Sequence, residues 1–195
     1  MGKRVLLIQG HPDAGRAHLC QALAEAYSAG AIEAGHEVRC IDVARLEFPL
    51  LKSQHEWEDG PLPDGLREPQ AAIGWAEHIV LFFPLWLGDM PALLKGFLEQ
   101  VARPEFAFGG TRENPFAHKP LAGRSARVVV TMGMPALVYR WYFRAHSVKS
   151  LERNILGFVG IAPVRATLIG MVGNLSAAAA AKWLAKLRKL GRRAE

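Results

Sequence analysis

Short apolar runs recur along the chain and alternate with longer stretches in which apolar residues follow helical spacing. The runs predict strands at Arg4–Gln9, Glu37–Asp42, Ile79–Phe83, Ala126–Thr131 and Val164–Ile169. Apolar runs of this length are typical of strands that are buried on both faces of a parallel sheet. The pattern therefore predicts a five-stranded parallel sheet with helices on both of its faces.

Helical spacing predicts the covering layers. The first helix, Ala17–Ala34, carries Leu19, Leu23 and Tyr27 near one face. Further helices are predicted at Pro91–Ala102, roughly at Ala145–Leu156, and at Ser176–Leu190. Residues 46–70 are rich in Pro, Gly and charge, so we predict a long loop there, which we call the excursion. Long loops in compact domains often form lids or binding edges.

The alternation of strands and helices predicts an α/β fold. Five parallel strands can take the order 2-1-3-4-5, in which a crevice opens between the ends of the first and third strands. The loops that begin at Gly10 and Pro84 would line that crevice, and they are the most distinctive loops of the sequence. We expect residues 1–195 to form a single domain of this kind.

Composition narrows the class of protein further. With 50% hydrophobic residues, the chain suits a globular protein with its own core. Cys20 and Cys40 have neither metal-ligand spacing nor the spacing of a disulfide framework, which indicates a reducing compartment. No apolar run approaches the roughly 18 residues that span a bilayer. The run after Met1 is too short for a signal peptide, so we expect a cytoplasmic location.

The net charge of +6 is concentrated near the C-terminus. Residues 175–195 are predicted to form a basic helix and tail, with cations at Lys182, Lys186, Arg188, Lys189, Arg192 and Arg193. A solvated helical face explains them, because the helix dipole favours cations at this end. We therefore expect no nucleic-acid partner, although a basic surface can draw anionic cofactors toward a site.

The loop Gly10–Cys20 joins the first strand to the first helix. The start of a helix after a strand is a ready anion site, because free backbone N–H groups and the helix dipole converge there. His11, Arg16 and His18 would add donors or positive charge. The plain alternative is a turn in which Pro12 and its neighbours only shape the chain. The loop is neither a dinucleotide GxGxxG nor a Walker loop.

The third and fourth strands lead into loops suited to a flat ligand. Pro84, Leu85, Trp86 and Leu87 would set peptide N–H groups and the Trp86 ring at the carboxyl edge of the sheet. Packing of Trp86 under the next helix is the alternative. After the fourth strand come Thr131, Met132, Gly133 and Met134, and Gly133 would let the chain turn its amides toward a ligand.

Three blocks of residues carry a family resemblance: Phe83-Pro84-Leu85-Trp86, Pro91-Ala92-Leu93-Leu94-Lys95-Gly96 and Glu105-Phe106-Ala107-Phe108. Together with His11-Pro12, they resemble the flavodoxin-like NAD(P)H:quinone oxidoreductases. That family includes the DT-diaphorase type and the ancillary subunits of bacterial potassium efflux systems. The resemblance runs from Arg4 to about Gly170. It implies a flavodoxin-like three-layer sandwich that binds a flavin, FMN or FAD, usually as a homodimer.

The resemblance also implies roles for single residues in holding the flavin. The first loop would wrap the flavin phosphate, with His11 and Arg16 among its residues. Ala17, His18 and Cys20 stand at positions of this loop where the family usually has hydroxyl and amide side chains. Glu105 matches a position near the flavin. The amides of Thr131, Met132, Gly133 and Met134 would stabilise the negative charge of the reduced ring.

A catalytic pair is implied as well. Tyr139 lies eight residues after Thr131, and His146 lies seven residues beyond Tyr139. A phenol donates a hydrogen bond and an imidazole titrates near neutral pH, so the two would serve protonation of a hydroquinone. The alternative is that the aromatic cluster around Tyr139 belongs to the core or to a dimer interface.

The implied activity is a two-electron, ping-pong transfer from NAD(P)H through the flavin to a quinone or similar acceptor. The resemblance further implies a possible peripheral association with a membrane transport protein. Two alternatives stay open at this stage. One is a flavin-binding regulatory partner with little turnover of its own. The other is a flavin-free α/β binding protein that uses its basic C-terminal helix on nucleic acid.

Overall fold

Five parallel strands form the centre of the molecule in the computed structural model, which describes residues 2–109 and 119–195. The strands are β1 (Arg4–Gln9), β2 (Glu37–Asp42), β3 (His78–Pro84), β4 (Ser125–Thr131) and β5 (Val164–Ile169). They pair in the order β2-β1-β3-β4-β5, so β2 and β5 are the edge strands. The predicted fold class and strand order are confirmed, and each predicted strand end lies within one residue of the observed one.

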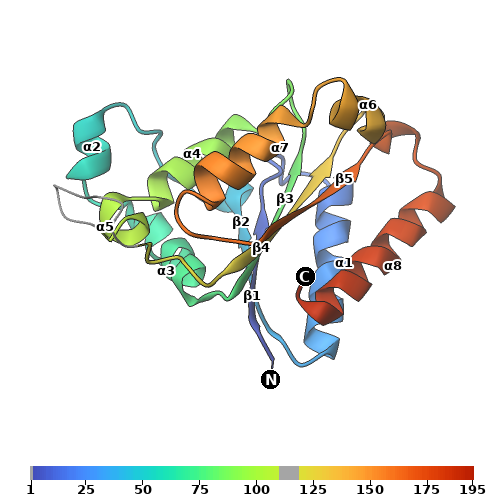
Figure 1. The fold of residues 1–195 in the computed structure, drawn as a ribbon, viewed down its shortest axis with the longest axis horizontal. Helices are drawn as coiled ribbons and strands as arrows, with labels where there is room; N and C mark the ends of the chain where they lie inside the picture. The colour runs from blue at the N-terminus through green and yellow to red at the C-terminus, as the bar shows by residue number, and fades with distance from the viewer. Residues whose placement is uncertain (1, 110–118) are drawn as a thin grey trace.

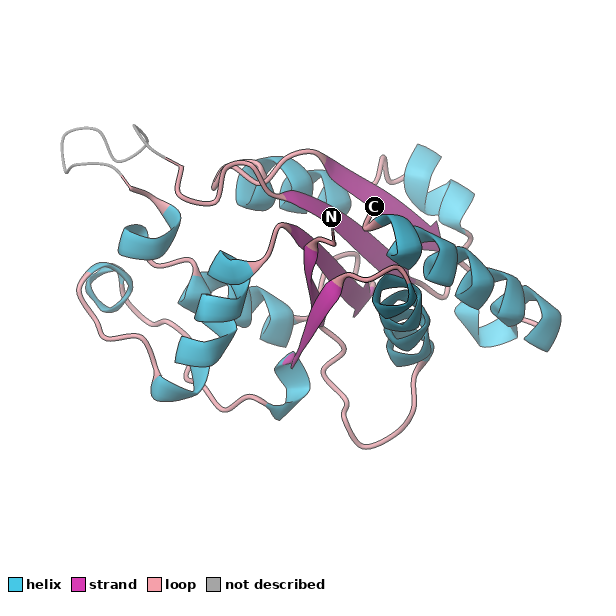
Figure 2. Ribbon diagram, turned by 90° about the horizontal axis from the view of Figure 1, so that it is seen from below, coloured by secondary structure: helices cyan, strands magenta, loops and turns pink. Residues whose placement is uncertain are grey.

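Helices cover both faces of this sheet, as Figures 1 and 2 show. One face carries α1 (Leu19–Glu33) and α8 (Ala177–Arg193). The other carries α3 (Arg67–Trp75), α4 (Ala92–Val101) and α7 (His146–Ser150), which continues as a π-helix over Leu151–Leu156. Shorter helices are α2 (Gln54–Glu58), α5 (Pro104–Ala107) and α6 (Ala136–Trp141), with 3-10 turns at Val43–Arg45, Asp64–Leu66 and Val172–Asn174.

Side chains alternate between the two faces along each strand, and this alternation builds two separate cores. On β1, Leu6 and Ile8 enter the core beneath α3, α4 and α7, whereas Val5 and Leu7 enter the core beneath α1 and α8. A central strand of this sheet needs an apolar residue at almost every position, which is why β1 and β3 stand out in the sequence as continuous apolar runs.

Helices α1 and α8 approach each other backbone to backbone at two glycines. A side chain at Gly30 would collide with the carbonyl oxygen of Arg188, and one at Gly191 would collide with that of Tyr27. Glycine at both positions therefore lets α8 lie close to α1, and this contact places α8 over the sheet near the edge strand β5.

The short helices α5 and α6 were not among those predicted, and the observed helices differ from the predicted ones in two further places. The helix predicted roughly at Ala145–Leu156 is α7 followed by the π-helix, and Arg144 and Ala145 precede it in the left-handed backbone region, with φ of 54° and 49°. The excursion is not wholly irregular, because it contains α2, a 3-10 turn and the first residues of α3. Local apolar spacing did not indicate either feature.

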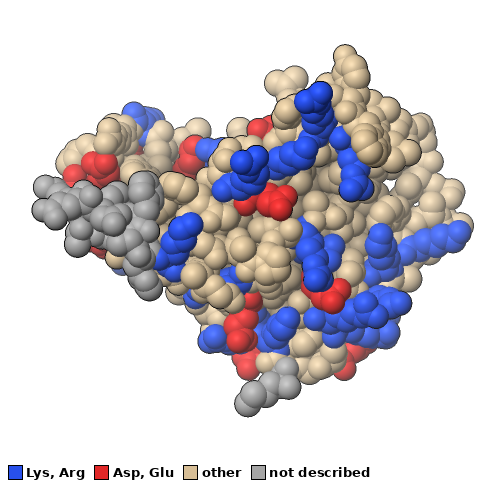
Figure 3. Space-filling model, viewed as in Figure 1, with Lys and Arg blue, Asp and Glu red and all other residues tan. Residues whose placement is uncertain are grey.

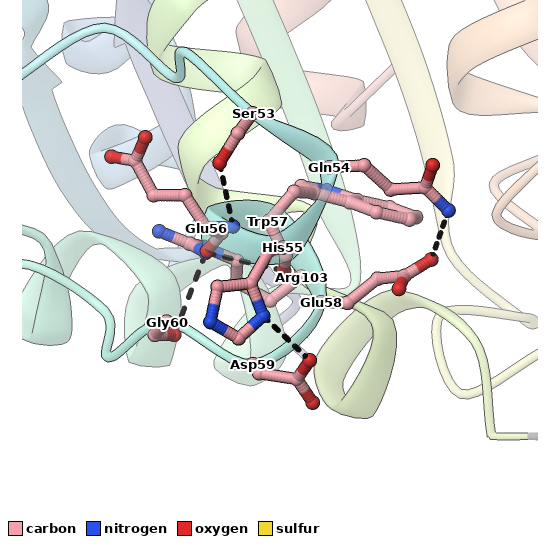
Figure 4. A network of polar contacts seen from close by, with 9 residues as sticks. All are labelled: Ser53, Gln54, His55, Glu56, Trp57, Glu58, Asp59, Gly60 and Arg103. Atoms are coloured by element: carbon pink, nitrogen blue, oxygen red, sulfur yellow. Dashed lines mark hydrogen bonds and ion pairs between the residues drawn. The ribbon is translucent and has the colours of Figure 1, made fainter.

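The excursion is tied to the body of the molecule by Arg103, whose side chain is buried and lies beneath α2 (Figure 4). Its guanidinium donates to the backbone carbonyl of Glu56, to that of Trp57 at 3.1 Å, and to that of Gly60 at 3.5 Å. It also donates to the side-chain oxygen of Gln100 at 2.6 Å. The carbonyls at the end of α2 thus replace water as partners of a buried cation.

Further bonds fix the excursion to the end of α4. The indole N–H of Trp57 donates to the Ala102 carbonyl at 3.1 Å, and the Gln100 amide donates to the Pro49 carbonyl at 2.6 Å. The Ser53 hydroxyl caps α2 by accepting from the Glu56 N–H at 3.1 Å (Figure 4). This segment is a fixed part of the surface in the structure, held mainly by side-chain bonds to backbone carbonyls.

Candidate functional site

The carboxyl ends of all five strands meet at one edge of the sheet, at the top of the view in Figure 1. Backbone bonds hold the loops that leave this edge in register. The Gly10 N–H donates to the Phe82 carbonyl at 2.7 Å, the Leu85 N–H to the Thr131 carbonyl at 2.7 Å, and the Met132 N–H to the Ile169 carbonyl at 2.9 Å. The sheet therefore brings together most of the residues that the sequence singles out.

Asp13 organises the loop between β1 and α1. Its carboxylate accepts from the Gly15 N–H at 2.8 Å and from the Arg16 Nε at 3.1 Å, and it lies 3.0 Å from the His18 Nε2. These bonds lower the pKa of the Asp13 carboxyl to about 2, and the bond from the Gly15 N–H contributes most. The sequence indicated Asp13 only as one of the turn formers next to Pro12 in the plain alternative, and its role as the hub of the loop depends on the three-dimensional arrangement.

Two imidazoles stack within this loop. The rings of His11 and His18 lie 3.6 Å apart, and the edge of the Trp86 ring approaches His11 with centroids 5.8 Å apart. Burial lowers the pKa of His11, and the neighbouring His18 lowers it further. Burial therefore disfavours the charged form of His11, and Trp86 shares the site with the β1–α1 loop.

The start of α1 leaves several backbone donors free. No hydrogen bond within the described residues uses the N–H groups of Arg16, Ala17, His18, Leu19 or Cys20. His18 occupies the cap position of α1, and its side chain makes no capping bond to the helix. Free N–H groups at the positive end of a long helix suit a phosphate, so the loop fits the anion that the sequence led us to expect.

The thiol of Cys20 faces away from these donors. Its sulfur is buried and lies 3.1 Å from the Thr131 hydroxyl, which links the base of the β1–α1 loop to the end of β4. Burial raises the pKa of Cys20 to about 11. The structure therefore offers the Cys20 N–H, rather than its side chain, to a ligand at this loop.

The loop after β3 projects an apolar tip. Pro84 ends the strand, and the backbone of Trp86 and Asp89 pairs across a tight turn, with N···O distances of 2.9 and 3.0 Å. Leu87 and Gly88 at the tip both have positive φ, 47° and 84°, as a type I′ turn requires. Leu87 is fully exposed and Trp86 is 50% exposed, so Trp86 does not pack wholly beneath the following helix. An exposed apolar side chain on a strained backbone points to a ligand-binding role.

The loop after β4 carries an open glycine. Met132 is buried, Met134 is half-buried and Gly133 is exposed, and nothing lies within 4 Å of the place where a Gly133 side chain would begin. The N–H groups of Gly133 and Met134 make no hydrogen bond within the described residues. Gly133 does not have a positive φ, so the free space above it, rather than its conformation, is the feature that suits a flat ligand.

The loop after β5 also reaches this edge, which the sequence had not indicated. Met171 donates its N–H to the Met134 carbonyl at 3.1 Å, and Val172 donates to the Met132 carbonyl at 3.2 Å. Met171 has a left-handed backbone, with φ of 56°, and is 41% exposed. The only local signal was the position of Gly170 directly after the strand.

The predicted catalytic pair lies at the junction of α6 and α7. Tyr139 is buried, its hydroxyl lies 2.6 Å from the Ser147 hydroxyl, and it also accepts from the Val148 N–H at 3.3 Å. His146 begins α7 and is exposed. The structure therefore sets the Tyr139 hydroxyl inside the α6–α7 turn and leaves the His146 ring in solvent.

Glu105 is not brought together with the other predicted site residues. It lies in α5 and lines a separate groove with Trp57, Arg67 and Arg103, on the side of the molecule where Figure 1 shows α2 and α3. The block Glu105–Phe108 follows the β3 loop closely in the sequence, but α4 lies between them and separates them in space.

Two other kinds of site have no support in the part of the chain that the structure describes. No group of three or more His, Cys, Asp or Glu side chains could hold a metal ion among residues 2–109 and 119–195. Over the same residues, no helix is long and apolar enough to cross a membrane.

Comparison with known proteins identifies the family. The model of the family described as having a flavodoxin-like fold matches residues 3–190, so the chain belongs to that family. A solved NAD(P)H:quinone oxidoreductase from Methanothermobacter marburgensis superposes with a TM-score of 0.82 at 27% identity, covering 100% of this chain and 97% of that one. The resemblance found in the sequence is confirmed at the level of the family.

Curated relatives agree on a class of chemistry. An uncharacterized NAD(P)H oxidoreductase of Haemophilus influenzae is 27% identical over 85% of this chain and 82% of its own length. FMN-dependent NADH:quinone oxidoreductase 1 of Hahella chejuensis is 33% identical over 53% of this chain and 46% of its own. The chain spans between 46% and 82% of the length of the curated relatives that it matches. These names support a flavin-dependent NAD(P)H oxidoreductase in general terms.

Proposed function

We propose that the protein is a flavin-dependent NAD(P)H oxidoreductase that passes two electrons to a quinone or a similar flat acceptor. One observation carries the proposal. At the same edge of the sheet, the free N–H groups at the start of α1 belong to the loop whose His11 ring contacts the half-exposed Trp86 ring, and the loops after β3 and β4 expose Leu87 and Gly133 there. An anion site next to exposed apolar side chains fits a flat ring system that carries a phosphate, as the flavin nucleotides do.

The protein's own groups would hold and orient that ring system. The N–H groups of residues 16–20 would bind the phosphate, and Arg16 would add charge once it turns from Asp13. Trp86 would contact the ring and help to exclude water. When bound, the flavin supplies the hydride chemistry, and the protein contributes placement and polarity.

The loop after β4 would tune the charge of the ring. The N–H groups of Gly133 and Met134 are free and belong to a loop that is fixed to β5 by the Met171 and Val172 bonds. Fixed donors aimed at the place where negative charge develops stabilise that charge without a further cost of reorganisation. FMN is the better candidate than FAD, because a relative that is named as FMN-dependent is 33% identical over its matched region.

The acceptor would meet the junction of α6 and α7. His146 is exposed there and can exchange a proton with solvent, whereas the Tyr139 hydroxyl is bonded to Ser147. We therefore assign proton transfer to His146 and a positioning role to Tyr139, which holds the start of α7. A homodimer remains part of this proposal, because the exposed apolar side chains of Leu87, Tyr142 and Phe143 give a second copy a surface to cover.

The proposal is tested by cofactor retention followed by turnover. The purified protein is incubated with FMN or FAD, desalted, and its visible spectrum is recorded before and after anaerobic NADPH or NADH. We expect retained flavin bands that bleach with the nucleotide and return when a simple quinone is added. Loss of both flavins on desalting would contradict the proposal. Bleaching without reoxidation by any quinone, nitro or azo compound would instead favour a regulatory flavin-binding partner.

A further inference from the structure

A further groove lies along the β5 edge of the sheet, next to the α6–α7 junction. It has a volume of about 1060 Å³ and runs over β5, between α6 and α7 on one side and α8 on the other. Ala166, Thr167 and Leu168 of β5 form its floor. In Figure 1 this strand faces the viewer with α7 and α8 to either side of it.

The floor of the groove presents unused backbone groups. β5 pairs with β4 alone, and the Pro163 and Ile169 carbonyls accept from the Ala126 and Met132 N–H groups at 2.9 Å. In a parallel pair, alternate residues direct both backbone groups at the neighbouring strand. The residues between them, Val164, Ala166 and Leu168, therefore direct their N–H and C=O groups outward.

These outward groups have no partner within the described residues. Ala166 is exposed, and the half-buried side chains of Val164 and Leu168 turn toward the core beneath α7, so the outer edge of β5 is open along its length. An open edge of this kind is the template that an added strand uses.

The walls of the groove are mainly basic, and Glu152 is the acidic residue among those that line it. Arg140, Arg144 and Lys149 stand on one side and Lys186 on the other, and none of the four forms an ion pair within the described residues. Lys186 lies over the Trp183 ring, 4.7 Å from its centroid. Figure 3 shows Lys and Arg side chains spread over this face, with smaller groups of Asp and Glu among them.

We propose that this groove binds an extended acidic segment of a partner protein, which adds to the sheet as a strand beside β5. The outward groups of Val164, Ala166 and Leu168 would supply main-chain bonds. The side chains of the added strand would alternate between the two basic walls, where acidic residues are matched by Arg140, Lys149 and Lys186. Main-chain pairing gives affinity in this mode of recognition, and the side-chain contacts give selectivity.

Charge also argues against the other occupants of an open edge. Two copies of this chain that paired through β5 would bring equally basic walls together, so the same cations that attract an acidic segment oppose edge-to-edge association. A nucleic acid would match the charge but would leave the outward N–H and C=O groups of the strand without the ladder that an extended peptide provides. The combination of free ladder groups and basic walls favours the peptide.

The test uses the whole chain of residues 1–195 and a labelled eight-residue peptide of alternating Glu and Val, with binding measured by fluorescence anisotropy. A second peptide has the same side chains but N-methyl groups at alternate residues, which remove its ladder donors. We expect the first peptide to bind, the N-methylated peptide to bind at least about tenfold more weakly, and the Ala166 and Leu168 amides to gain protection from hydrogen exchange.

Matched charge reversals locate the binding. Lys149→Glu and Lys186→Glu should each weaken binding of the first peptide by about tenfold, because each replaces an attraction with a repulsion. Arg153→Glu and Lys189→Glu make the same kind of change at exposed positions in the same two helical segments but outside the groove, and they should change binding less than about twofold.

Three outcomes would overturn the proposal. Equal binding of the two peptides would mean that charge acts without strand addition. Tighter binding of single-stranded DNA, weakened by the same two reversals, would make the groove a nucleic-acid site. Ala166→Pro removes one outward N–H and leaves the β4 ladder intact; if this variant converts a dimer to a monomer, the edge belongs to a second copy.

Discussion

Two regions of this molecule carry long connections, and they use their polar groups in opposite ways. In the excursion, residues 46–70, carbonyls and side chains are bonded to the body through Arg103, Gln100 and Trp57. In the loops at the carboxyl edge of the sheet, N–H groups at residues 16–20 and at Gly133 make no bond within the described residues. The first region is held by its own contacts, and the second keeps its donors available.

The backbone shows the same contrast. Non-glycine residues with positive φ occur at Leu87 and Met171 on the carboxyl edge and at Arg144 and Ala145 beside it, whereas no residue of the excursion has one. Left-handed backbone costs an ordinary residue roughly 1–2 kcal/mol. Left-handed residues beside exposed apolar side chains therefore indicate a ligand site at the carboxyl edge. In the excursion, polar groups that are bonded to the body of the molecule indicate a structural role.

The largest expected effect is on the excursion. Arg103→Ala would leave the carbonyls of Trp57 and Gly60 without a donor and would remove one donor from that of Glu56, which keeps the Gly60 N–H. It should lower the free energy of unfolding by about 3 kcal/mol. Chemical denaturation measures this loss. Arg103→Lys keeps the charge but not the forked donors and should recover only part of it. A stability within about 0.5 kcal/mol of the unaltered protein would contradict the structural role assigned to this region.

Acid should lower the free energy of unfolding, because a histidine is buried in the central sheet. His78 is buried at the start of β3, where burial lowers its pKa to about 3 and Lys3 lowers it further. Unfolding returns its pKa to the ordinary value of 6.5, so the unfolded chain binds the proton first. The stabilisation is complete above pH 6.5 and is lost as pH falls toward about 3, at up to about 1.4 kcal/mol per pH unit.

His78→Gln should remove this part of the slope when unfolding is measured from pH 7 to pH 4. As a matched control, His55→Gln replaces an exposed histidine of the excursion and is measured over the same pH range. If the free energy of unfolding of His78→Gln falls with pH as steeply as that of the unaltered protein, groups other than His78 govern the acid sensitivity.

A pair of tryptophans separates binding from stability. Trp86→Ala removes the half-exposed ring at the carboxyl edge and should raise the Kd for FMN about tenfold, which is about 1.4 kcal/mol, with little change in unfolding. Trp57→Ala truncates the same kind of ring in the excursion and should lower stability while leaving the Kd within about twofold. Flavin fluorescence quenching and denaturation measure the two quantities, and the reverse pattern would reverse the roles of the two regions.

The smallest effect is expected at the turn tip. Leu87→Asn should raise the free energy of unfolding by roughly 0.5–1 kcal/mol, because Asn tolerates positive φ and the Leu87 side chain buries no surface. Leu87→Ala trims the exposed side chain without relieving the backbone and should leave stability nearly unchanged. Thermal unfolding of the two variants tests whether strain, rather than exposure, is the cost at this position.

The sequence predicted the sheet well, because each strand is specified by its own residues. Arg4–Gln9 and Val164–Ile169 form strands with the predicted bounds, since position in a parallel sheet demands local apolar runs. The break at Arg144 and Ala145 could not be predicted, because neither residue is a usual former of left-handed turns. The turn is closed by a bond from the Ala145 N–H to the Tyr139 carbonyl at 3.0 Å, six residues earlier, which apolar spacing does not indicate.

The candidate site was predicted in outline and not in detail. The two crevice loops were found because they follow β1 and β3, and strand order places them together. The stack of His11 on His18, the hub at Asp13 and the bond between Tyr139 and Ser147 are contacts between side chains that no local pattern encodes. The position of the site could be predicted from the sequence. Which backbone N–H groups make no hydrogen bond could be learned only from the structure.

The most direct test of the central claim is hydrogen exchange of the backbone amides, read by mass spectrometry with and without saturating FMN. We predict slower exchange on binding in the segments that contain residues 14–20, 85–89 and 132–135, and no change in residues 52–63 of the excursion. Protection confined to the excursion, or to the β5 edge, would contradict the assignment of the carboxyl edge as the flavin site.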